Sequence, residues 1–226
     1  MADATLQHSV AAAHGAADEF EAPLFGAYSK KVGMWLFLAS DSLTFGALLF
    51  AFSYNRIYTV WPTPFGKDSI INATVMTACL LSSSLTMVMA VFAAQRKDPT
   101  WTRNWLLATM AFGTAFIVLH GMEWTKLIHE GLTVPGFPKS AGQDAGEFAR
   151  ISTGVPQFAA TFFGLTAMHM LHVTIGVLYL AIIAWGFGKE KYTAEHVEVS
   201  GLYWHFVDLV WMFIFPMVYL LSVNPK

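Results

Sequence analysis

Five long stretches of the chain are almost free of charged residues, and polar segments separate them. They cover approximately residues 32–55, 69–95, 104–128, 155–187 and 200–222. A helix needs about 20 apolar residues to cross a bilayer core about 30 Å thick, so each stretch is long enough. None shows the alternation with period 2 that is typical of transmembrane strands. Because backbone polar groups in lipid need internal partners, the pattern predicts an all-α integral membrane bundle of five transmembrane helices.

The composition agrees with this pattern. Of the 226 residues, 55% are hydrophobic and only 12% are charged, whereas an average soluble domain has about 25% charged residues. The net charge of −2 provides no basic excess for nucleic-acid binding. The single cysteine, Cys79, excludes a disulfide framework and any cysteine-rich metal cluster.

The segments outside the spans predict the organisation of the chain. Residues 1–31 contain no apolar core like that of a signal peptide, so we expect a polar N-terminal tail followed by a transmembrane domain over residues 32–223. The longest connection, about residues 129–154, is rich in proline and glycine and predicts a small cap. Lys30 and Lys31 directly precede the first span. The positive-inside rule therefore favours a cytoplasmic N-terminus and an external C-terminus.

Three carboxylic acids lie well inside the expected spans, where ionisable groups are costly. They are Asp41, Glu123 and Asp208. Asp41 lies between Ser40 and Ser42; because burying an unpaired charge is expensive, its carboxyl group would be protonated or hydrogen-bonded. Two interpretations stay open at this point: a proton-exchanging carboxyl or inter-subunit contact, and a satisfied hydrogen bond between helices.

Histidines accompany these acids on three spans. Each span carries a pair spaced i,i+3, which places both side chains on one helix face. The pairs are His120 with Glu123, His169 with His172, and His205 with Asp208. One hypothesis is a metal or haem site between facing helices. The other is a buried hydrogen-bond network that fixes helix packing.

Small and aromatic residues predict where helices pack. Ala160 and Gly164 form a small-x-x-x-small pair, and Ala73, Thr77 and Ser82–Ser84 give the second span a small, polar side. Both patterns let helix backbones approach closely. A further group contains Tyr203, Trp204, Phe206 and Trp211. It is typical of an aromatic belt at the membrane surface that continues into a buried face.

Several segments resemble subunit III of the haem-copper oxidases. Residues Glu198–Trp211 (EVSGLYWHFVDLVW) resemble its C-terminal signature, a Glu followed by Trp-Tyr-Trp-His-Phe-Val-Asp and a Trp. Residues Phe163–Gly176 resemble its Gly-Phe-His-Gly-x-His-Val-x-x-Gly helix. Leu38–Asp41 is similar to its Ser-Glu segment and Leu80–Ser84 to its Leu-Ser-Ser segment. His120–Trp124 lies where the family has Gln-x-x-Glu-Tyr. The order matches over about residues 30–223.

The resemblance implies an accessory subunit without redox centres or catalytic residues. Such a subunit packs beside catalytic subunit I, in a complex that also contains subunit II, in the bacterial plasma membrane. It binds phospholipid, supports proton uptake and protects the enzyme during turnover. Haem and copper would lie in the partner subunits and none in this chain. The residues expected to serve as buried polar, proton-related or packing groups are Asp41, His120, Glu123, His169, His172, Glu198, His205 and Asp208.

The chain also departs from the family pattern. It has five expected helices where many members have seven, so it resembles the short form, which lacks two helices that help to form a lipid-holding cleft. Asp41 replaces a Glu and His120 replaces a Gln. The adjacent His-His pair of the oxygen-reducing subunit and the two cysteines of the electron-entry subunit are both missing. Two alternatives are a bis-His haem electron carrier, and an accessory subunit of a nitric oxide reductase.

Overall fold

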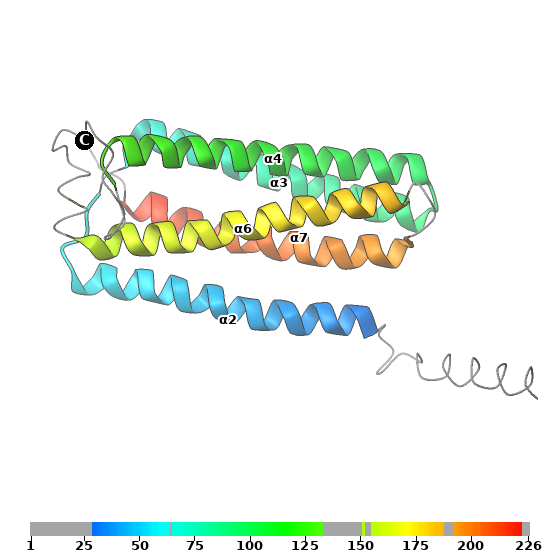
Figure 1. The fold of residues 1–226 in the computed structure, drawn as a ribbon, viewed down its shortest axis with the longest axis horizontal. Coiled ribbons are helices and arrows are strands. Elements are labelled where there is room, and N and C mark those ends of the chain that lie inside the picture. The colour runs from blue at the N-terminus through cyan, green and yellow to red at the C-terminus, as the bar shows by residue number, and fades with distance from the viewer. Residues whose placement is uncertain (1–28, 64, 133–150, 152–154, 188–191, 223–226) are drawn as a thin grey trace, which may run out of the picture. The chain divides into compact units, whose positions relative to one another are not determined.

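The computed structural model describes residues 29–63, 65–132, 151, 155–187 and 192–222. Within these ranges the chain forms five long helices (Figure 1). Their bounds are α2 Ser29–Tyr58, α3 Lys67–Gln95, α4 Pro99–His129, α6 Pro156–Phe187 and α7 Ala194–Ile214, and α7 continues through a π-helical turn, η2 Phe215–Tyr219, and a 3₁₀ turn, η3 Leu220–Ser222. All five are long and apolar enough to cross a membrane. The protein is therefore an all-α integral membrane protein, as predicted.

Four of the five helices begin earlier than the charge pattern suggested. Helix α2 starts at Ser29, so the last residues of the expected tail are helical. Helix α7 starts at Ala194 and includes Glu198, which the sequence placed ahead of the last span. The rest of the expected tail, residues 1–28, and most of the expected cap, residues 133–150 and 152–154, lie outside the described residues.

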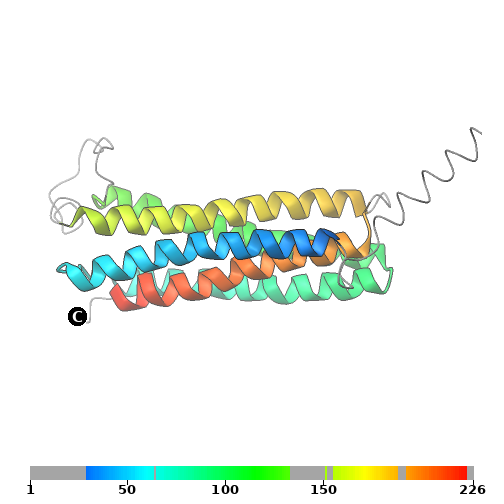
Figure 2. The same ribbon diagram turned by 90° about the horizontal axis from the view of Figure 1, so that it is seen from below.

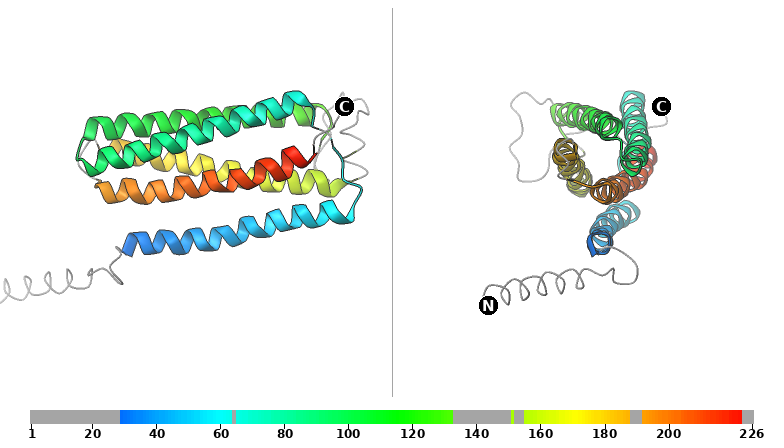
Figure 3. Two further views of the ribbon diagram at one scale, coloured as in Figure 1. Left: turned by 180° about the vertical axis from the view of Figure 1, so that it is seen from behind. Right: turned by 90° about the vertical axis from the view of Figure 1, so that its right-hand side faces the viewer.

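The contacts within the chain divide it inside α2, into residues 1–40 and residues 41–226. Of the smaller unit the structure describes only the first part of α2, Ser29–Ser40. The larger unit contains the rest of α2 and the four following helices. In this unit α3 packs against α4, α4 against α6, α6 against α7, and α7 against α3. These four helices form a closed ring, which is visible end-on in Figure 3 (right), and they run side by side along the bundle in Figure 2.

Local chemistry sets the ends of these helices. Asp98 caps α4, because its carboxylate accepts hydrogen bonds from the backbone N–H groups of Thr100 and Trp101, both at 3.1 Å. Pro99 takes the first helical position, where no N–H is needed. At the other end of the bundle, Pro216 cannot donate a backbone hydrogen bond, and the last helix widens there into the π-helical turn η2.

The close helix contacts centre on Trp204 of α7, which is 1% exposed. Its indole N–H donates to Ser83 Oγ of α3 at 3.0 Å. A Cβ atom added at Gly113 of α4 would lie 2.6 Å from this indole, and one at Gly176 of α6 would lie 2.9 Å from it. The two glycines thus make room for one tryptophan, which joins α3, α4, α6 and α7.

One packing prediction needs correction. Ala160 and Gly164 are exposed, and an added Cβ at Gly164 would meet nothing within 4 Å. Their small faces therefore point away from the bundle, and Gly113 and Gly176 provide the close approach instead. In contrast, the aromatic group of α7 continues into a buried face, as expected, because Tyr203, Trp204 and Trp211 are buried. The small polar side of α3 is also used: Thr77 Oγ1 accepts a hydrogen bond from Trp211 Nε1 at 3.0 Å.

Candidate functional site

Asp41 of α2 and His172 of α6 form a buried acid–imidazole pair. The distance between Asp41 Oδ2 and His172 Nε2 is 3.2 Å, and the two side chains are 10% and 9% exposed. The other ring nitrogen, Nδ1, lies 2.7 Å from the backbone carbonyl of Met168. A carbonyl oxygen can only accept, so His172 Nδ1 carries a proton and donates it. Nε2 is thereby the nitrogen that faces the carboxyl group.

The surroundings of His172 hold its ring in place. Its backbone carbonyl accepts a hydrogen bond from the Tyr203 hydroxyl of α7 at 3.0 Å. The Phe45 ring packs edge-on against the imidazole, with the ring centroids 5.1 Å apart. Phe45 is one helical turn after Asp41 on α2, so the same helix supplies both the acid and the packing partner. The pair is therefore positioned by three helices.

His169 and His120 lie deeper, among aromatic rings. His169 stacks on Trp211 with the centroids 5.1 Å apart, and Phe116 packs edge-on against both. His120 lies beside Trp211 at 5.6 Å and above Phe116 at 5.5 Å. Both histidines are fully buried, and their ring nitrogens form no hydrogen bond within the part of the chain that the structure describes. Aromatic packing is thus their main contact.

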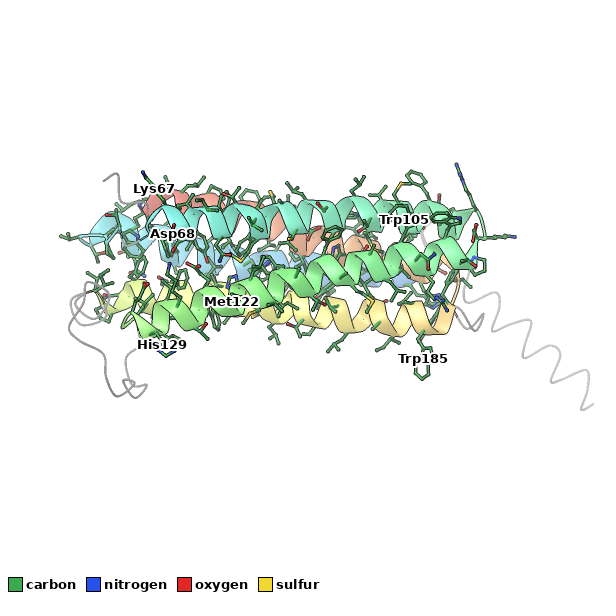
Figure 4. All side chains as sticks on the ribbon, turned by 90° about the horizontal axis from the view of Figure 1, so that it is seen from above. Lys67, Asp68, Trp105, Met122, His129 and Trp185 are labelled. Atoms are coloured by element: carbon green, nitrogen blue, oxygen red, sulfur yellow. The ribbon has the colours of Figure 1, made fainter. Side chains whose placement is uncertain are left out.

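Glu123 pairs with a residue that the sequence interpretation missed. The amide of Asn72 on α3 donates to Glu123 Oε2 at 2.9 Å, and Glu123 is 4% exposed. Asn72 carries no charge, so a search for charged residues passed over it. Its signal in the sequence is a carboxamide near the start of an otherwise apolar and hydroxyl-rich helix. The contact ties α3 to α4 near the end of the bundle that Figure 4 marks with Lys67, Asp68 and His129.

His205 and Asp208 of α7 have different surroundings. Ser84 Oγ of α3 lies 2.8 Å from His205 Nδ1, whereas both carboxyl oxygens of Asp208 are buried and form no hydrogen bond to any described residue. Asp208 is buried, whereas His205 is partly exposed. The contact between His205 and Ser84 therefore joins α7 to α3.

The other two i,i+3 pairs do not act as units either. His172 contacts Asp41, whereas His169, one turn away, contacts Trp211. Glu123 contacts Asn72, whereas His120 contacts aromatic rings. Glu198 is half-buried on α7. Among the described residues, no group of three or more His, Cys, Asp or Glu side chains is arranged to hold a metal ion.

Comparison with known proteins agrees with these motifs. A family model described as cytochrome c oxidase subunit III matches residues 144–223. The cytochrome c oxidase subunit 3 of Alkalihalophilus pseudofirmus is 31% identical over 201 residues, which cover 87% of this chain and 88% of that protein. The cytochrome bo(3) ubiquinol oxidase subunit 3 of Pseudomonas aeruginosa is 30% identical over 227 residues, which cover 98% and 99% of the two chains.

The fold and the buried polar groups define a membrane-embedded helix bundle with polar contacts between its helices. The relatives identify it further: the chain belongs to the subunit III family of the haem-copper oxidases. It is an accessory, non-catalytic subunit of an oxygen-reducing terminal oxidase, and it associates with other subunits of that complex.

Proposed function

We propose that the chain packs beside the catalytic subunit I of a bacterial oxidase, in a complex that also contains subunit II. Haem and copper lie in those partners, and this chain holds no cofactor. The N-terminus is cytoplasmic and the C-terminus external. Support for this orientation comes from Lys30 and Lys31 at the start of α2, and from Arg96 and Lys97 in the α3–α4 turn. Two spans separate these groups, so both face the same side of the membrane.

Within this complex, the Asp41–His172 pair stores and exchanges one proton for proton uptake by the enzyme. The two ring nitrogens of His172 have different partners. Since His172 Nδ1 donates to the Met168 carbonyl, a neutral ring presents a lone pair at Nε2. An ionised Asp41 would also present a lone pair across the 3.2 Å contact. The contact is attractive only if a proton lies between the two atoms.

This proton has two stable positions. It is either on the carboxyl group beside a neutral imidazole, or on Nε2 as part of an imidazolium that faces a carboxylate. In both forms the proton lies between the same two atoms, so it can arrive or leave through either residue while the helices stay in place. This chemistry suits a group that passes protons toward a neighbouring subunit. The 3.2 Å contact between Asp41 and His172 is the single observation that carries the proposal.

Asp41→Asn in the assembled oxidase tests the proposal. An asparagine has nearly the shape of Asp41, and its amide can donate to the Nε2 lone pair, so the contact is kept without an exchangeable proton. We expect a complex with normal haem content that turns over more slowly or loses activity faster during turnover. Asp208→Asn is the matched control, because it makes the same change at a buried acid whose oxygens form no hydrogen bond to any described residue. Equal turnover and equal inactivation rates in both variants would reduce the pair to a packing contact.

A further inference from the structure

The α3–α4 hairpin carries a groove that lies outside the candidate functional site. It has a volume of about 400 Å³ and lies at the end of the hairpin where the two helices are joined. Arg96 and Asp98 line its polar end, and Met89, Phe92, Trp101 and Trp105 line its apolar walls. Figure 4 marks Trp105 at this end of the bundle. Its lining residues lie on α3, on α4 and in the turn between them, whereas the Asp41–His172 pair lies on α2 and α6.

The groove is amphipathic along its length. Arg96 directly follows the last residue of α3, which places it at the level of the lipid headgroups. Met89 is seven residues earlier, about 10 Å deeper at 1.5 Å per residue. Trp101 and Trp105 stack with ring centroids 6.1 Å apart and form the facing wall. A ligand that fits must combine a polar head with an apolar chain at least this long.

The charge at the polar end selects an anion. Arg96, Lys97 and Arg103 carry three positive charges, and Asp98 carries the one negative charge of this segment. The Asp98 carboxylate already accepts two backbone N–H groups of α4. The Arg96 guanidinium is exposed and forms no ion pair within the described part of the chain. A guanidinium with open donors matches the oxygens of a phosphate group.

We infer that the groove between Arg96 and the Trp101–Trp105 stack binds one anionic phospholipid, with the phosphodiester on Arg96 and an acyl chain along Met89 and Phe92. The indole groups suit this position, since tryptophan prefers the boundary between headgroups and hydrocarbon. The inference rests on the membrane placement of the chain and not on the proton role of Asp41. It goes beyond the lipid binding that the family resemblance implies, because it names a place outside α2 and a headgroup charge.

The test uses the complete oxidase, purified in mild detergent and depleted of loosely bound lipid. Native mass spectrometry then counts the lipids retained during titration with phosphatidylglycerol or phosphatidylcholine. We expect the unaltered complex to retain phosphatidylglycerol in preference to phosphatidylcholine. Arg96→Gln should weaken the retention of one phosphatidylglycerol about tenfold, since a hydrogen bond to a charged group contributes about that much to binding. Arg103→Gln is the matched control, because Arg103 carries the same charge nearby but does not line the groove.

Three results would overturn the inference. One is equal retention by the Arg96→Gln and Arg103→Gln complexes at unchanged haem content. Another is displacement of the bound lipid by millimolar inorganic phosphate, which would identify a site for free anions. The third is a crosslink from Trp101 or Trp105 to another subunit, which would identify a protein contact. None of these results alters the assignment of the chain to subunit III, which co-purification tests separately.

Discussion

A single methyl group on α4 should disturb the centre of the bundle. In Gly113→Ala the new Cβ would lie 2.6 Å from Trp204 Cη2 and 3.0 Å from Cζ2. Carbon atoms in contact are normally about 3.5–4.0 Å apart, so the indole must retreat by about 1 Å. Trp204 is fully enclosed and hydrogen-bonded to Ser83, which leaves it little room. Overpacking of this kind costs about 1–3 kcal/mol.

A second substitution shows whether the clash is the cause. Trp204→Phe alone should destabilise the protein, because it removes the hydrogen bond to Ser83, worth about 0.5–1.5 kcal/mol, and leaves a cavity. However, phenylalanine lacks the benzo-ring atoms that would meet the new methyl group. The double variant, Gly113→Ala with Trp204→Phe, should therefore be less destabilised than the sum of the single variants, by about 1 kcal/mol or more.

Thermal denaturation of the detergent-purified complex, followed through release of this subunit, provides the assay. Gly121→Ala is the control on the same helix, because an added Cβ there meets nothing within 4 Å. We expect Gly121→Ala to be neutral or slightly stabilising, since alanine favours helices more than glycine. The reasoning is refuted if Gly113→Ala is as stable as Gly121→Ala, or if the double variant shows simple additivity.

Two further changes test the contacts of α3. Thr77→Val keeps the side-chain shape but leaves the Trp211 indole N–H without its acceptor. Thermal denaturation should therefore show a loss of stability of about 1–3 kcal/mol. Thr74→Val is the control and should cost less, because it removes only a hydrogen bond within its own helix. Asn72→Leu removes the donor to Glu123, and should destabilise by about 1–3 kcal/mol because the buried carboxyl is left unpaired. The explanation is contradicted if Asn72→Leu lowers stability by the same amount in a chain that already carries Glu123→Gln, because a neutral amide costs less to leave unpaired than a carboxyl group.

The five helices were predictable because charge is so rare inside them. A membrane span excludes nearly all ionisable residues, so gaps between charges mark the helices directly. The same rarity identified Asp41, Glu123 and Asp208, all of which are buried. Spacing of three residues also placed His169 and His172 on one face of a helix, and in the structure both are buried.

The partners of these residues could not be predicted, because they come from other helices. Spacing along α6 says nothing about whether His172 meets α2 or α4, and only the packed bundle brings Asp41 to it. The small-residue pattern at Ala160 and Gly164 failed for the same reason, since a small face can point inward or outward. Gly113 and Gly176 show the difference: each is opposite a large side chain, Trp204, that no local pattern links to it.

The central claim is that this chain is an accessory oxidase subunit that carries no redox centre. Its most direct test is a reduced-minus-oxidised absorbance spectrum, recorded on the complex purified through a tag on this chain and again on the chain after its separation from the complex. We predict a haem spectrum and a haem-copper catalytic subunit in the purified complex, and no haem absorbance in the separated chain. Haem that stays with the separated chain, or a tagged chain that purifies alone as a stable protein, would contradict the account.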